Sequence, residues 1–295
     1  MAQTHQTRAQ RMLQARYVQL RDHKSEHISV EEALKMRIEV TGLDLESLSS
    51  AFFRPLTSKY FASYPVLAKT KEAIEREEPT MFKVREYNAA AAALVSTSWE
   101  RMQWSPASCT GDITNTLDNF IWHLPRQNAP EGLGCSLANF SIWSPADTPA
   151  LVGKARYLND PPLSDRTSRL DSMFQVEEYT YPHVVMTLKN YTRQPASDGV
   201  LLRHELAYIV RAMQLRLEEG YFDQDQPQPV LLLSFMAPQH GRVLEAHIEG
   251  SSKILIKCSR LYSFEKNEDA PFELFYRWLL ADPVGMTPCE PKPEE

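Results

Sequence analysis

The sequence predicts an α/β protein with a mixed β-sheet, and three observations in its C-terminal half favour that class. Residues 170–179 and 183–189 each have the length of a strand, and a long amphipathic helix follows over about 198–219. Residues 230–235 then form a continuous apolar run, which is typical of a strand buried on both faces. A strand–helix–strand passage of this kind indicates an α/β sandwich.

The predicted long helix has a start, an apolar stripe and an end in the sequence. Ser197 or Asp198 is a suitable N-cap, and Gly220 is a suitable C-terminal stop. The stripe recurs at three- and four-residue steps and consists of Leu202, Leu206, Ile209, Val210, Met213 and Leu217. His204 and Glu205 flank this stripe, so we expect both to be exposed, although His204 could reach the sheet.

Two further elements follow the buried strand. Residues 242–249 and 253–261 flank the turn Gly250-Ser251-Ser252, which predicts a β-hairpin. Residues 271–281 are predicted to form a final short helix. The acidic, proline-rich stretch 282–295 is predicted to be disordered.

The N-terminal part of the chain is predicted to be helical over about 5–75. Ser29 is a plausible N-cap for a helix over 30–40, which Gly42 would end. A second short helix is predicted over 44–53, before Pro55. We therefore divide the chain into a helical N-terminal region (1–79), an α/β core domain (80–281) and a tail (282–295).

The core domain is predicted to begin with a helix over 80–102. Its apolar residues share one face, among them Val84, Tyr87 and Ala91. Residues 104–168 are rich in Pro and Gly and give a weak pattern, in which only 112–123 is typical of a helix.

Charge and composition exclude several classes of protein. The 295 residues are 43% hydrophobic and 24% charged, which are globular proportions. The net charge is −6, with a net +4 over residues 1–24 and −5 over 265–295. Such a chain has no overall attraction for a phosphate backbone, so nucleic-acid binding would require a local basic patch. No apolar run approaches the roughly 18 residues that span a bilayer.

Cysteine usage favours an intracellular, reducing setting, in the cytoplasm or the nucleus. Cys109, Cys135, Cys258 and Cys289 are scattered, without the spacing of a metal-binding pair. The first 21 residues contain arginine and no acidic residue, as in a mitochondrial presequence, although an exposed amphipathic helix explains the same pattern.

The predicted order of elements over about 80–264 resembles the PD-(D/E)XK, or restriction-endonuclease-like, core, and in particular the nuclease-like domains abundant in filamentous fungi. That family places a Glu on the first core helix, an Asp on the second strand and a (D/E)xK motif on the third. A long helix and a further strand follow. The corresponding residues here are Glu86, Asp171 and Lys189.

The resemblance implies metal-dependent hydrolysis of phosphodiesters, with Glu86 and Asp171 as carboxylate ligands of Mg²⁺ and Lys189 placing or activating the attacking water. The sequence departs from the motif at Thr187, where the family has a carboxylate two residues before the lysine. A hydroxyl brings no negative charge, so the predicted site is degenerate.

Each of the three residues also has a structural explanation. Glu86 fits a solvated helix residue, Asp171 a turn or cap residue at a strand start, and Lys189 a surface charge at a strand end. Three functions therefore remain open. They are a metal-dependent nuclease-like protein, a non-catalytic binding or accessory protein with the same fold, and an enzyme of small-molecule biosynthesis whose pocket Trp122 and Trp143 would line.

A second group of polar residues alternates along one predicted strand. Glu245, His247 and Glu249 share a face and would suit a divalent metal, or a solvated sheet face with cross-strand charge pairs to Lys253 and Lys257. His240-Gly241-Arg242 follows the buried strand, where loops often line sites, and Gly241 permits an unusual backbone angle.

Overall fold

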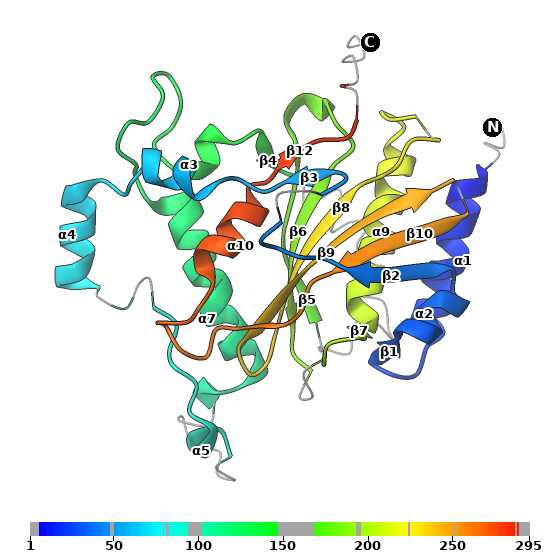
Figure 1. The fold of residues 1–295 in the computed structure, drawn as a ribbon, viewed down its shortest axis with the longest axis horizontal. Helices are drawn as coiled ribbons and strands as arrows, with labels where there is room; N and C mark the ends of the chain where they lie inside the picture. The colour runs from blue at the N-terminus through cyan, green and yellow to red at the C-terminus, as the bar shows by residue number, and fades with distance from the viewer. Residues whose placement is uncertain are drawn as a thin grey trace.

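The computed structural model describes residues 6–47, 50–78, 80, 83–93, 102–146, 168–192, 196–223, 225–250, 252–286 and 288. Over these residues the protein is α/β, with an eight-stranded mixed sheet between helices (Figure 1). The predicted fold class is confirmed in this form. No helix in the described part of the chain is long and apolar enough to cross a membrane.

The sheet combines strands from both ends of the chain, in the order β2-β10-β9-β8-β6-β5-β4, with β11 pairing with β9. Only β6 with β8 and β10 with β2 are parallel pairs. The bounds are β2 (Ile38–Gly42), β4 (Trp143–Pro145), β5 (Ser168–Val176), β6 (Val184–Asn190), β8 (Val230–Met236), β9 (His240–Glu249), β10 (Lys253–Cys258) and β11 (Tyr262–Ser263).

Helices cover both faces of the sheet and create two apolar cores (Figure 1). On one face lie α9 (Arg203–Glu219) and α1 (Arg8–Asp22), and on the other lie α7 (Pro106–Asp118) and α10 (Phe272–Leu279). Because strand residues alternate between faces, each strand contributes to both cores. The protein is therefore a three-layer α/β/α structure.

The remaining elements are short. They are β1 (His27–Ser29), α2 (Val30–Lys35), β3 (Phe53–Arg54), α3 (Ser58–Ser63), α4 (Ala68–Glu77), α5 (Ala89–Ala92), the π-helix η1 (Asn119–His123), the 3-10 helices η2 (Leu137–Phe140) and η4 (Glu177–Tyr179), β7 (Val200–Leu202) and β12 (Asp282–Pro283). β1 pairs with β7, and β3 with β12.

The C-terminal half follows the sequence prediction closely, except that the long helix is not capped by Ser197 or Asp198: it begins at Arg203, after the strand β7. The long helix ends at Gly220, which has the left-handed φ of 72° that the stop requires. The apolar run forms the buried strand β8, and the hairpin forms as β9 and β10. The regular alternation and length of these segments were sufficient to identify them.

The predicted helix over 80–102 is wrong in its first part. Residues 83–88 are not helical, and a helix of four residues begins only after Asn88, whose side chain caps it. The backbone of this stretch bonds elsewhere instead, because Tyr87 N donates to Glu265 O and Gln239 Nε2 donates to Arg85 O. Residues 94–101 of the prediction lie outside the described residues.

Two N-terminal helix predictions also need correction. Ser29 caps a helix as expected, but that helix ends at Lys35, and Ile38–Gly42 form the strand β2. Over 44–53, the described residues form no helix, and Phe53 enters β3. In both places pairing with a distant strand outweighs local helix preference.

The N-terminal region is integrated with the core domain. β2 hydrogen-bonds to β10, and α1 packs against α9 in one apolar cluster. The division at residue 79 stays a prediction, but the two parts share a sheet. At the other end, Asp282 and Pro283 are ordered as β12, and the predicted disorder of 289–295 falls outside the described residues.

Candidate functional site

Asp171 and Lys189, which are predicted site residues on two different strands, are in direct contact. Lys189 Nζ lies 2.7 Å from Asp171 Oδ1, and each side chain is only 14% exposed. An ion pair at this depth is screened weakly by solvent and has a defined geometry. The structure therefore brings together two of the three predicted site residues.

Asp171 lies at a β-bulge, beside the lysine. In the regular register Arg169 faces Lys189 and Leu170 faces Leu188, but the next pair is Ser172 with Thr187, so Asp171 is the extra residue. Asp171 lies two residues after Arg169 and therefore on the face of Lys189, and the bulge leaves it without a partner on β6. Asp171 thus joins Lys189 on the α7 side of the sheet.

A third charged residue, Asp118, completes this group. Asp118 is the last residue of α7, which packs against β6 and β8. Burial, and after it the nearby Asp171, raise the pKa of its carboxyl to about 6, and Lys189 and His123 oppose the shift. We call Asp118, Asp171 and Lys189 the acid–lysine cluster.

The position of the missing carboxylate holds a hydroxyl pair. Thr187 is 3% exposed, and its Oγ1 lies 2.5 Å from Ser172 Oγ on the neighbouring strand. The two hydroxyls satisfy each other and add no negative charge to the cluster. The negative charge of the cluster therefore comes from two carboxylates.

Glu86 does not belong to the cluster. Its carboxylate is exposed and accepts hydrogen bonds from the backbone N and the side-chain Nδ2 of Asn267, at 3.3 and 3.4 Å. The expected helix does not form at this point, so the reason for placing Glu86 on a core helix disappears. Sequence reasoning missed Asp118, because it lies in the middle of the predicted helix over 112–123 and only the observed helix ends there.

The cluster has some of the features of a divalent-cation site. Asp171 Oδ2 is buried and has no hydrogen-bond partner, and carboxylate oxygens are the ligands that Mg²⁺ prefers. Asp118 supplies a second carboxylate, but the described residues contain no group of three or more His, Cys, Asp or Glu that could hold a metal ion. The donor set thus fits a cation held by two side chains and completed by water or substrate.

The second predicted group, on β9, is covered rather than open. Glu245 is 1% exposed and accepts hydrogen bonds from Ser50 Oγ and Phe52 N, while burial raises its pKa. The His247 ring packs against the Phe52 ring with centroids 4.6 Å apart. The segment before β3 therefore lies over this face, and only Glu249 forms a hairpin ion pair, with Lys253 at 2.6 Å.

Arg242 and Glu205 form a buried ion pair on the other face of the sheet. Arg242 donates to both carboxylate oxygens of Glu205, and the two side chains are 1% and 0% exposed. The expectation that His204 and Glu205 are exposed is wrong, because both are buried and Glu205 faces Arg242 on the sheet. Gly241 is needed for space, since a Cβ there would lie 2.9 Å from the Phe235 ring.

The tryptophans proposed as pocket walls belong to the core. Trp143 is 5% exposed, and its Nε1 donates to Ala281 O. Trp122 stacks on Phe174 with ring centroids 5.0 Å apart. These contacts account for both side chains without a ligand.

Comparisons with family models, with curated proteins and with solved structures find no match to this chain.

Proposed function

We propose that the protein is a PD-(D/E)XK nuclease-like enzyme that hydrolyses phosphodiesters with a divalent cation such as Mg²⁺. The observation that carries the proposal is the contact between Asp171 and Lys189 beside Asp118. The order of elements supports it, since α7, β4, β5, β6, α9 and β8 follow the helix–three strands–helix–strand layout of that family. Asp171 lies on the second of these strands and Lys189 on the third.

In this proposal Asp118 takes the place that the sequence assigned to Glu86. The carboxylates of Asp118 and Asp171 would hold the cation, which when bound polarises a phosphoryl oxygen and lowers the pKa of a water molecule. The Lys189 ammonium group would orient that water or the scissile phosphate. A cation between the carboxylates would also favour ionised Asp118, whose pKa of about 6 otherwise leaves it partly protonated near neutral pH.

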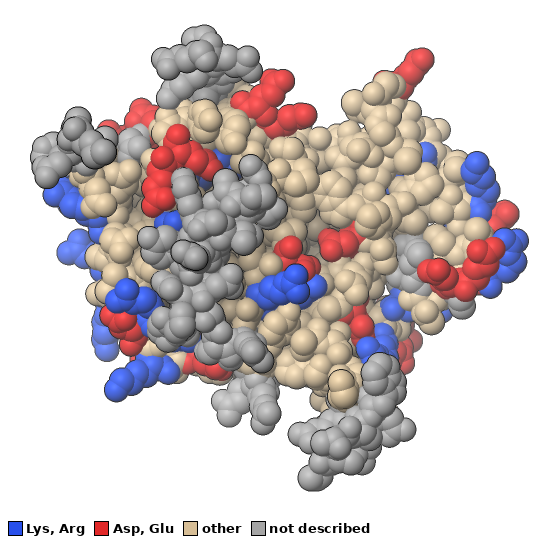
Figure 2. Space-filling model, turned by 180° about the vertical axis from the view of Figure 1, so that it is seen from behind, with Lys and Arg blue, Asp and Glu red and all other residues tan. Residues whose placement is uncertain are grey.

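The charge on the surface restricts the way in which a nucleic acid would bind. Figure 2 shows Lys and Arg gathered near the edge formed by α1 and α2, and a mixture of acidic and basic residues over the other described parts of that face. Beside the cluster, Arg169 is exposed and faces Lys189 in the strand register, so it is suited to contact a neighbouring phosphate. Binding of a nucleic acid would therefore depend on basic residues close to the cluster, such as Arg169.

We place the protein in the cytoplasm or the nucleus, because the cysteines in the described part of the chain are unpaired.

A non-catalytic binding or accessory protein is the second candidate. The specific observation in its favour is the buried Thr187–Ser172 hydroxyl pair at the motif position that should carry a carboxylate. In that case the cluster, in which Lys189 is already paired with Asp171, would stabilise the sheet and have no catalytic role.

Cleavage assays decide between the two candidates. Purified protein is incubated with supercoiled plasmid and with RNA, in Mg²⁺, in Mn²⁺ and in EDTA. We expect metal-dependent cleavage that falls at least about 100-fold in Lys189→Ala, Asp171→Asn and Asp118→Asn, because each removes a charged group from the reaction centre.

Glu86→Gln is the matched control, since it removes an acid of the original motif that lies outside the cluster. Its activity should equal that of the wild type. Cleavage that persists in Lys189→Ala would refute the assignment of the site. Absence of cleavage under all metal conditions, in protein shown by circular dichroism to be folded, would favour the binding protein.

A further inference from the structure

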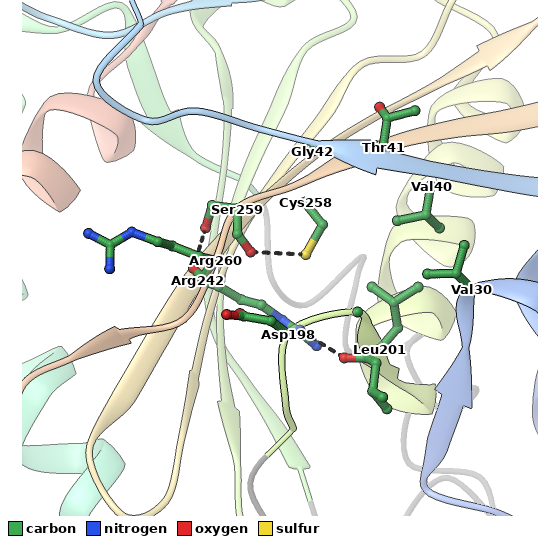
Figure 3. Close-up of a pocket in the computed structure, with 12 residues that line it drawn as sticks. Val30, Val40, Thr41, Gly42, Asp198, Leu201, Arg242, Cys258, Ser259 and Arg260 are labelled. Atoms are coloured by element: carbon green, nitrogen blue, oxygen red, sulfur yellow. Dashed lines mark hydrogen bonds between the residues drawn. The ribbon is translucent and has the colours of Figure 1, made fainter.

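A pocket of about 370 Å³ lies on the face of the sheet opposite the acid–lysine cluster, between the ends of β2 and β10 and the strand β7 (Figure 3). Arg242 at its base alternates along β9 with Val243, which packs on the α7 side, so the pocket and the cluster are on different faces. Its volume falls within the range of pockets that bind small ligands. A ligand in this pocket would therefore lie on the face away from the proposed site of hydrolysis.

The walls of the pocket are mainly aliphatic. Val30, Val40, Val200 and Leu201 line it, together with the thiol of Cys258. Burial raises the pKa of Cys258 to about 12, so the thiol is uncharged at neutral pH and behaves as a weakly polar wall. This part of the pocket suits an apolar group.

The positive charge of the arginine at the base of the pocket is already balanced by a carboxylate. Arg242 donates from Nε to Glu205 at 2.9 Å and from Nη1 to the carbonyl of Val200 at 2.9 Å. Its second amino group also contacts Glu205, so the pair brings no net charge. The other arginine of the pocket, Arg260, stacks on the Tyr262 ring at 4.2 Å and directs its guanidinium away from the aliphatic walls (Figure 3).

Asp198 is the acid that remains at the mouth. It is exposed, its Oδ1 accepts a hydrogen bond from Leu261 N at 2.9 Å, and it forms no ion pair among the described residues. It lies close enough to Arg242 and Cys258 to influence both of their pKa values. The pocket thus combines an apolar interior with a carboxylate at its entrance that forms no ion pair among the described residues.

We propose that this pocket binds a small organic cation with an apolar body, of the class of the aliphatic primary amines. The hydrocarbon part lies against Val40 and Leu201, and the ammonium group pairs with Asp198. An anion of the same shape is disfavoured, because its charge would face Asp198 while both arginines are engaged elsewhere.

Calorimetric titration with n-hexylamine, n-hexanoate and n-hexanol tests the proposal. We expect the amine to bind, the alcohol to bind about fivefold more weakly and the carboxylate not to bind. In the series butylamine, hexylamine and octylamine, affinity should rise up to about fourfold for each methylene that enters the pocket.

Two variants separate the charge from the apolar walls. Asp198→Asn should reduce amine affinity about fivefold and leave hexanol binding unchanged. Gly42→Leu should abolish binding of both, because Gly42 lines the pocket on the same strand face as Val40 and a Cβ there meets no atom within 4 Å. Thermal melting confirms that each variant is folded.

Asp225→Asn, which removes an exposed acid elsewhere, is the matched control and should bind the amine like the wild type. The proposal is wrong if hexanoate binds as well as hexylamine, if Asp198→Asn and Asp225→Asn bind the amine equally, or if none of the three probes binds.

Discussion

Lys189 contacts Asp171 at 2.7 Å even though the regular register of β5 and β6 places Arg169 opposite Lys189. Asp171 follows Arg169 by two residues on the same strand face, and the bulge leaves it without a partner on β6, so its carboxylate is free to pair with the lysine. The Asp171 carboxylate then lies near Asp118, the last residue of α7. The cluster is therefore formed by a bulged residue of β5, the end of α7 and Lys189 of β6.

Breaking the ion pair should destabilise the protein. Lys189→Met leaves the Asp171 carboxylate buried without its cation, and we expect a loss of about 2 kcal/mol in the free energy of unfolding, somewhat below the value for a fully buried pair. The double variant Asp171→Asn/Lys189→Met should recover part of the loss. Urea titration at pH 7 of the wild type, Lys189→Met, Asp171→Asn and the double variant gives the coupling energy, and a value within error of zero would show that the pair does not act as a unit.

Asp118 should make stability fall as the pH rises. Its pKa is about 6 in the folded protein against an ordinary 3.8, so the folded state retains a proton that the unfolded chain has released. Between about pH 4 and pH 6 stability should therefore decrease, by up to about 3 kcal/mol, and then level off.

Asp118→Asn removes that decrease and should be more stable than the wild type at pH 7. Urea titrations at several pH values test this, with the exposed Asp225→Asn as a control that keeps the wild-type slope. An unchanged slope in Asp118→Asn would show that the carboxyl titrates normally. If the cluster binds a cation, 10 mM Mg²⁺ should stabilise the wild type at pH 7 and leave Asp118→Asn unaffected.

Local patterns were enough to predict the C-terminal elements, since α9, β8 and the β9–β10 hairpin each have a strong period and a clear end. They failed where pairing is non-local. The strand β2 exists because Ile38–Gly42 pair with β10, more than two hundred residues later, and no local signal reports that partner.

The site was predictable only in part for the same reason. Asp171 and Lys189 lie on well-patterned strands, so both could be proposed. Asp118 enters through the packing of α7 on the sheet, and Asp171 is left unpaired by a bulge that strict alternation does not predict. Glu86 was chosen because a helix was expected there, and its backbone instead follows other segments.

The buried pair of Arg242 and Glu205 should contribute strongly to the integrity of the fold. Glu205→Gln leaves a guanidinium that is 1% exposed without its counter-charge, and we expect a loss of about 3–5 kcal/mol. Replacing both residues by apolar ones, as in Glu205→Leu/Arg242→Met, should cost less than the single change. Glu75→Gln, in an exposed pair with Lys71, should change stability by less than about 0.5 kcal/mol. Equal losses in Glu205→Gln and Glu75→Gln would contradict this interpretation.

His183 should make the protein sensitive to acid. The ring is fully buried, its Nε2 donates to the carbonyl of Val284 at 3.1 Å, and burial lowers its pKa to about 4. As the pH falls from about 6.5, the unfolded chain gains a proton that the folded protein does not bind, so stability decreases by about 3 kcal/mol until the pH reaches about 4.

Because Asp118 gives the opposite slope over part of this range, the measurement is made in the Asp118→Asn background. There, His183→Gln should flatten the acid side of the profile while His27→Gln should not, and the same slope in both would mean that protonation of His183 does not limit stability. Because the ring contacts Val284, protonating it in place would put a charge next to the pairing of β3 with β12, and that pairing should open before the eight-stranded sheet does.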